Sequence, residues 1–120
     1  MPAPIPDPGG FLPLPAATFH ILIALAKEDR HGYAIMQDVA TRTNGALKLS
    51  PGTLYGSIRR MLDEGLIVEL SDRQRPEEDD ERRRYYRITP FGRSVAQAEA
   101  ARLATLLRQA KAVGLTPGRA

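Results

Sequence analysis

Residues 50–64, SPGTLYGSIRRMLDE, combine hydroxyl groups, arginines and glycines in a pattern that can bind a polyanion. Ser50 followed by Pro51 predicts a helix N-cap with proline in the first turn. At 100° per residue, the large apolar side chains of a helix over 52–64 share one face: Leu54, Ile58, Met61 and Leu62. The opposite and flanking positions form an outward face: Gly52, Thr53, Tyr55, Gly56, Arg59, Arg60 and Asp63.

This outward face has the chemistry of a nucleic-acid contact. Arginine reaches phosphates and guanine edges, and the first turn of a helix presents free amide donors at a positive dipole end. Glycine inside a helix costs about 1 kcal/mol relative to alanine. At position 56 it would let the backbone approach the wall of a DNA groove. An ordinary surface helix with a tolerated glycine is the alternative that this stretch alone leaves open.

Further arginines flank a polar loop over 71–83. The stems of this loop form a basic base that can straddle the DNA backbone or a minor groove, with Arg73 and Arg75 on one side and Arg82, Arg83 and Arg84 on the other. The tip, 77–81, is acidic, and a charge run of this kind is usually a solvated loop. We therefore predict DNA contacts at the stems, of which Arg73, Arg75 and Arg83 are the chosen candidates, and we add Lys48 just ahead of the 52–64 helix.

Catalytic and metal chemistry find no support in the residue pattern. The two histidines, His20 and His31, have no carboxylate at a metal-ligand spacing, and the chain contains no cysteine. It also shows neither a glycine-rich phosphate loop nor a nucleophile motif. We predict no catalytic residue, no metal site and no cofactor, and hence a protein that is not an enzyme.

The elements that position the candidate residues follow from apolar periodicity and turn signals. Helices are predicted over 15–26, 33–43 and 52–64, with 29–32 as a turn. Residues 66–70 and 84–88 are rich in β-branched and aromatic side chains and predict a two-stranded hairpin, or wing. A last helix is predicted over 90–113. The fold class is therefore mainly α with a small β-hairpin: a winged helix-turn-helix of three helices and a two-stranded wing, followed by a long C-terminal helix.

Length and composition predict one domain with extensions. The predicted divisions are a proline-rich flexible arm over 1–14, the winged helix-turn-helix over 15–89, a dimerisation helix over 90–113 and a tail over 114–120. No apolar run reaches the roughly 20 residues of a membrane span, and no secretory signal is visible. The lack of cysteine fits a cytoplasmic protein. The net charge of +3 leans only slightly towards polyanions.

Two features predict a second copy of the chain as a partner. In the last helix, small and apolar residues recur at alternating spacings of four and three, namely Ala96, Ala100, Leu103, Leu107 and Ala110. The first helix is apolar on nearly all sides, so we expect a second subunit to cover part of it, including Leu22. Packing of the last helix back onto its own domain is the alternative.

The residues resemble the PadR family, named for the repressor of phenolic acid decarboxylase. The matching stretches are FHILIALAKEDRHGYAIM over 19–36, SPGTLYGSIRRMLDEGLI over 50–67 and RYYRITPFG over 84–92. The resemblance implies a homodimeric winged-helix repressor, often one released from DNA by a small molecule. It also implies DNA contacts on the helix opened by Ser50, including Thr53, Tyr55 and Ser57, and a phosphate contact for Tyr33 in the HGY turn.

Two functions from different classes remain at this point. The first is a repressor that binds an inverted-repeat operator in double-stranded DNA as a homodimer, under the control of a small-molecule effector. The second is a winged-helix module that binds another protein and has no DNA-binding activity. The basic outer face of the helix over 52–64 favours the first function.

Overall fold

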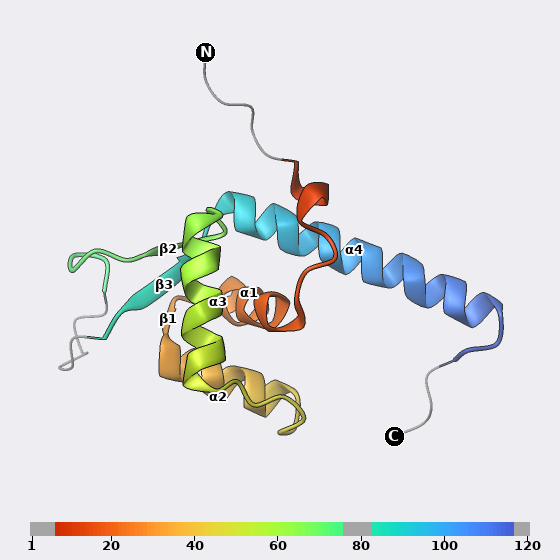
Figure 1. Cartoon of the computed structure of the whole chain (residues 1–120), viewed down its shortest axis with the longest axis horizontal. Coiled ribbons are helices and arrows are strands. Elements are labelled where there is room, and N and C mark those ends of the chain that lie inside the picture. The colour runs from red at the N-terminus through yellow and green to blue at the C-terminus, as the bar shows by residue number, and fades with distance from the viewer. Residues whose placement is uncertain (1–6, 76–82, 117–120) are drawn as a thin grey trace, which may run out of the picture.

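In the computed structural model, which describes residues 7–75 and 83–116, the predicted order of three helices, a hairpin and a long helix is confirmed. The elements are η1 (Pro8–Phe11), α1 (Ala16–Lys27), β1 (Arg30–His31), α2 (Gly32–Arg42), α3 (Pro51–Asp63), β2 (Ile67–Glu69), β3 (Tyr85–Ile88) and α4 (Pro90–Ala112). In Figure 1, α1 lies in the middle of the body, α3 crosses it, and α4 runs out beyond the other helices. The fold is the predicted winged helix-turn-helix with a long C-terminal helix.

Side-chain caps explain where the two longest helices begin. The Ser50 hydroxyl accepts a hydrogen bond from the Thr53 amide at 3.1 Å, and proline follows at the first position of α3. Thr89 and Pro90 repeat this arrangement at the start of α4, where the hydroxyl accepts from the Gly92 amide at 2.9 Å. These caps satisfy amides that the helix itself leaves unpaired.

The wing is a three-stranded antiparallel sheet in the order β1-β3-β2, rather than the predicted two-stranded hairpin. Residues 29–32 were expected to form a turn, but Arg30 and His31 pair with Tyr86 and Tyr85 of β3. The other edge of β3 pairs with β2, with Ile88 opposite Ile67. Because β1 has only two residues, it shows no alternation from which a strand could be predicted.

The core is built around α1, which packs against α2, α3, α4 and β3. Leu22 is 0% exposed in the single chain, and this corrects its predicted place in a dimer interface. The prediction failed because the chain itself wraps α1 on several sides. Phe19 and Ile23, one turn apart on α1, remain only partly buried.

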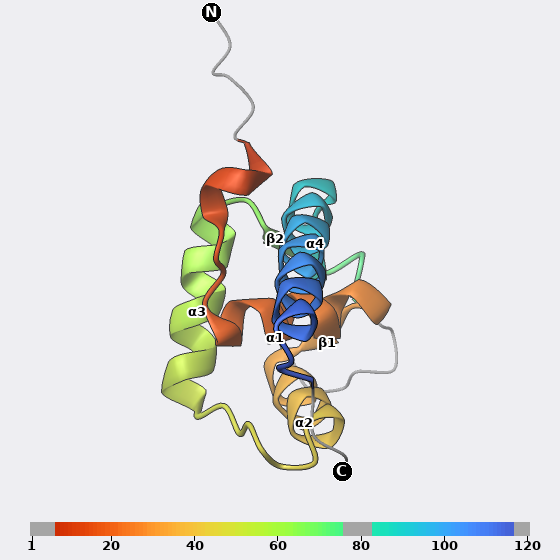
Figure 2. The same ribbon diagram turned by 90° about the vertical axis from the view of Figure 1, so that its right-hand side faces the viewer.

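The segment before α1 corrects the prediction of a loosely held arm, at least from residue 7 onwards. Pro8–Phe11 form a 3₁₀ turn, and the Phe11 ring meets the edge of Phe91 in α4 with centroids 5.4 Å apart. Leu14 is buried, and its amide donates to Glu99 Oε2 of α4 at 3.0 Å. In Figure 1 this segment, the strap, crosses α4 on its way to α1, and Figure 2 shows that it lies on the same side of α4 as α3 does. Residues 1–6 lie outside the described residues.

The last helix separates from the body along its length. Its first half is anchored by Val95 and Glu99, both buried, whereas the side chains after Arg102 are nearly all exposed. Among the residues described, no helix has the length and apolar character needed to cross a membrane.

Candidate nucleic-acid interface

The outward face of α3 forms as predicted. Leu54, Ile58 and Met61 point into the core, while the opposite side chains are exposed, namely those of Thr53, Tyr55, Arg59 and Arg60, together with Gly52 and Gly56. Ser57 is the exception. It is only 9% exposed, because it lies one turn after Leu54 and therefore shares the buried side of the helix. This corrects the predicted DNA contact of Ser57.

Neither glycine of α3 is explained by packing within the chain. A Cβ built on Gly52 or Gly56 would meet no atom within 4 Å. Gly56 lies in the middle of the helix, where glycine costs stability relative to alanine. The missing side chain therefore leaves an open stretch of backbone on the exposed face.

The cations on this face have no ion partner among the residues that the structure describes. Arg59 and Arg60 form no ion pair or side-chain hydrogen bond within the residues described, and the same holds for Lys48 and Arg73. Several arginines elsewhere in the body are paired with carboxylates, Arg42 with Asp38, Arg87 with Asp29 and Arg102 with Glu99. The exposed face of α3 thus carries two arginines that no described side chain pairs.

The start of α2 joins α3 to the wing. A Cβ on Gly32 would lie 2.5 Å from Tyr55 Oη and 2.9 Å from its Cζ, so the tyrosine of α3 rests directly on the Gly32 backbone. His31 Nδ1 accepts from the Ala34 amide at 3.1 Å and caps α2. Tyr33 stands beside this junction and is well exposed. The HGY stretch therefore organises the surface as well as contributing a phenol to it.

The stems of the wing are less uniform than predicted. Arg83 is exposed, and its Nη1 lies 2.9 Å from Nε2 of His31, which brings it to the junction of α2 and β3. Arg73 is exposed, whereas Arg75 is half-buried and 3.3 Å from Asp72. Arg82 and the acidic tip, 77–81, lie outside the described residues. Sequence reasoning missed His31, for which the signal was its place in the HGY turn, two residues before the predicted contact Tyr33.

Displaced pKa values in the part of the chain described here belong to structural groups. A hydrogen bond from Arg102 lowers the pKa of Glu99, with a further contribution from the Leu14 amide. Burial raises the pKa of Tyr86, and burial, with Arg42 nearby, lowers the pKa of His20. The Asp29 hydrogen bond raises the pKa of Arg87. The shifts of Glu99 and Arg87 come from hydrogen-bonded ion pairs, whereas those of Tyr86 and His20 come from burial. None of these groups lies on the exposed face of α3.

The predicted dimer residues of α4 fall along one side of that helix. Leu103 and Leu107 are 40% and 43% exposed, Ala100 is exposed, and Ala96 and Ala110 are half-buried. Leu106, which the predicted seam leaves out, is 51% exposed. It could have been found from the second alternation of three and four through 99, 103, 106 and 110. Beside the seam, α1 and α4 enclose a groove of about 380 Å³ that Phe19, Ile23, Ala96 and Ala100 help to line.

Comparison with known proteins places the chain in a family. It is 32% identical over 94 residues to the transcriptional regulator Rv3488 of Mycobacterium tuberculosis, covering 78% of this chain and 81% of that protein. It is 34% identical over 74 residues to an uncharacterised protein X of Lysinibacillus sphaericus, of which it spans 65%, just under two thirds.

Solved structures agree with this placement. A transcriptional regulator from Clostridium thermocellum superposes with a TM-score of 0.67 at 25% identity, over 86% of this chain and 89% of that one. Residues 21–98 match the model of the transcriptional regulator PadR-like family, which is a family of regulators and not of enzymes. The chain therefore belongs to the PadR-like family of transcriptional regulators.

Proposed function

We propose that this chain is a repressor that binds double-stranded operator DNA as a homodimer in the cytoplasm, with α3 lying in the major groove. One observation carries this proposal: the exposed face of α3 combines two unpaired arginines with glycines that have open space in front of them. Arginine makes bidentate hydrogen bonds to guanine edges. A helix without a side chain at its centre can bring those arginines closer to the bases.

The residues around α3 supply the contacts that hold it in register. Ser50 and Thr53 stand at the N-terminal end of α3, where amides and the helix dipole favour a phosphate. Tyr33, Lys48 and Arg83 are exposed near α3 or at the wing stem and are proposed to bind the DNA backbone. Such contacts position the protein, while the base contacts specify the sequence.

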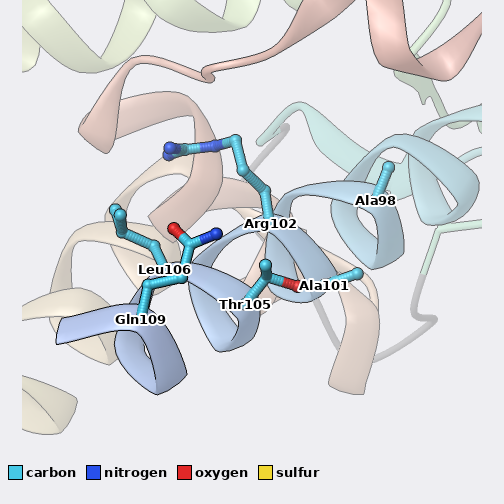
Figure 3. Close-up of a pocket in the computed structure, with 6 residues that line it drawn as sticks. All are labelled: Ala98, Ala101, Arg102, Thr105, Leu106 and Gln109. Atoms are coloured by element: carbon cyan, nitrogen blue, oxygen red, sulfur yellow. The ribbon is translucent and has the colours of Figure 1, made fainter. Parts of the chain in front are cut away.

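The unpartnered half of α4 supports the homodimer. An open hollow of about 390 Å³ lies along α4. The side chains that line it, drawn in Figure 3, all belong to that helix: Ala98, Ala101, Arg102, Thr105, Leu106 and Gln109. No other element of the described chain covers this surface. The same chain offers both a row of exposed leucines and an apolar groove between α1 and α4. In a two-fold dimer, the exposed leucines of each copy would pack against the apolar surface of the other copy.

A symmetric dimer has a recognisable DNA partner. Its operator should be an inverted repeat whose half-site centres lie about one helical turn apart. Release of counterions by the arginines and lysines should make affinity fall steeply with salt. The effector proposed for such a repressor would raise the melting temperature of the dimer in a screen of small molecules.

The proposal is tested by selecting binding sites from random duplexes and titrating the selected and scrambled DNA at two salt concentrations. Arg60→Ala should weaken binding about 5- to 150-fold, which corresponds to about 1 to 3 kcal/mol for a bidentate base contact. Arg108→Ala is the matched control, because Arg108 is exposed on α4 and, within 7–75 and 83–116, its side chain bonds only Thr105, one turn earlier. Failure to select any DNA, or equal affinities for the two variants, would favour the protein-binding module instead.

A further inference from the structure

The first turn of α4 is joined to the end of α3 by an unusual density of polar contacts. The Thr89 hydroxyl lies 2.6 Å from the Gly65 carbonyl oxygen, to which it donates, and 3.1 Å from that of Leu66. The Thr89 amide also donates to the Leu66 carbonyl at 3.1 Å. The same hydroxyl oxygen accepts from the Gly92 amide, as the cap of α4. One side chain therefore binds two elements at once.

Gly92 brings the two backbones into direct contact at this point. A Cβ on Gly92 would lie 2.9 Å from the carbonyl carbon of Leu66 and closer still to its oxygen. Because the obstructing atoms belong to the backbone, a change of rotamer cannot relieve the overlap. Only glycine permits this approach, so the first turn of α4 is seated on the Leu66 peptide.

The Leu66 peptide is itself part of the end of α3. The Leu66 amide donates to the Met61 carbonyl, and the Glu64 amide donates to the Arg60 carbonyl, both in the last turn of that helix. Gly65, with a φ of 76°, makes the tight turn between them. The contacts of Thr89 and Gly92 therefore reach α3 with no flexible segment between the two helices.

We propose that Thr89 and Gly92 form a rigid joint that fixes the orientation of α3 relative to α4, and thereby sets the half-site spacing of the operator. This inference rests on the proposed function, because it assumes a dimer joined through α4 that reads DNA with α3. Apolar packing of α4 on α1 is non-directional. Directional bonds to α4 come from Arg93, whose Nη2 donates to the Ala26 carbonyl at 3.4 Å, from the Leu14 amide on Glu99, and from the joint. Of these, the joint is the one that links the rotation of α4 about its own axis to the end of α3.

The lever arm shows why the joint matters for spacing. α3 extends about 20 Å from the joint, with 13 residues at 1.5 Å each. If the far half of α4 is held by the partner, a pivot of about 10° at the joint moves the far end of α3 by about 3 to 4 Å. Successive base pairs are about 3.4 Å apart. A loose joint would therefore shift each α3 by about one base pair, and the spacing between the two copies by up to about two.

Substitutions at Thr89 can remove its hydrogen bonds to the end of α3 while keeping its role as the N-cap of α4. Thr89→Asp keeps an excellent N-cap acceptor for the Gly92 amide, but its carboxylate has no proton for the Gly65 and Leu66 carbonyls. Thr89→Ser keeps both functions. Ser94→Ala is the control, because Ser94 is exposed and its hydroxyl, in the part of the chain that is described, bonds only the Pro90 carbonyl of its own turn.

The first measurement needs no DNA. The chain has no cysteine, so spin labels can be placed at Glu64→Cys and Lys111→Cys and diluted with unlabelled protein. The α3–α4 distance distribution should be narrow in the parent, Thr89→Ser and Ser94→Ala, and broader in Thr89→Asp. Gly92→Ala, which keeps the Thr89 hydroxyl, should broaden it as well and serves as the second variant if Thr89→Asp does not fold.

The second measurement is affinity for inverted repeats whose spacing changes by one base pair at a time, with a single half-site as reference. The parent and Thr89→Ser should favour one spacing at least tenfold over a shift of two base pairs. Thr89→Asp should flatten this preference to about threefold or less, with half-site affinity unchanged. If Thr89→Asp folds and keeps the parent's preference for one spacing, the role of the joint is contradicted but the proposed function is not. If the parent binds no inverted repeat, the proposed function itself is contradicted.

Discussion

Replacing Gly56 by leucine should stabilise the protein and weaken its binding to DNA. The structure leaves open space at this position, since a Cβ on Gly56 would have no neighbour within 4 Å. Leucine is the better helix former by roughly 0.5 to 1 kcal/mol. In a chain of this length that gain corresponds to a rise of about 2 to 5 °C in melting temperature. Thermal unfolding followed by circular dichroism measures it.

The loss of DNA binding follows from the same open space. A leucine at position 56 would project from the middle of the exposed face and hold α3 away from the groove. A shift of about 1 Å carries hydrogen bonds of about 2.9 Å past their useful range. Loss of even one bidentate contact costs about 1 to 3 kcal/mol, so operator affinity should fall at least about fivefold.

Gly56→Leu should therefore change stability and DNA affinity in opposite directions, and a second leucine substitution serves as the control. Ala104→Leu adds a leucine at an exposed position of α4 and should leave DNA affinity unchanged. Operator affinity of Gly56→Leu within twofold of the parent would show that α3 does not enter the groove. A lower melting temperature would show that the position is crowded, contrary to the structure.

Three further predictions concern the interface, the α2–α3 contact and acid stability. Leu103→Glu should convert the dimer to monomer in sedimentation, and a folded dimeric variant would place the interface elsewhere. Gly32→Ala should cost about 1 to 3 kcal/mol in the parent and far less in a Tyr55→Ala background, so equal costs would contradict the contact. The Arg102 hydrogen bond lowers the pKa of Glu99, so this pair should stabilise the fold fully above pH 4.5 and lose that effect as the pH falls further. In urea unfolding at several pH values, Glu99→Gln should make the free energy of unfolding less dependent on pH in this acidic range.

The sequence alone predicted much of the fold and which face of α3 is exposed, because these depend on local patterns. The period of Leu54, Ile58 and Met61 determines which side of α3 is buried. Ser50 and Thr89, each followed by proline, mark the starts of two helices through bonds spanning only three residues. Both signals are contained within one or two helical turns and need no information about distant parts of the chain.

Only the tertiary structure decided how those elements meet. Leu22 was assigned to a partner because its burial by α2, α3 and α4 depends on contacts that are distant in sequence. Likewise, β1 exists because β3 lies beside it, and the strap is held by Glu99, 85 residues from Leu14. Gly32 and Gly92 look alike in the sequence, but the first makes room for a tyrosine and the second for a backbone carbonyl. Such close approaches depend on packing in three dimensions, on which local periodicity carries no information.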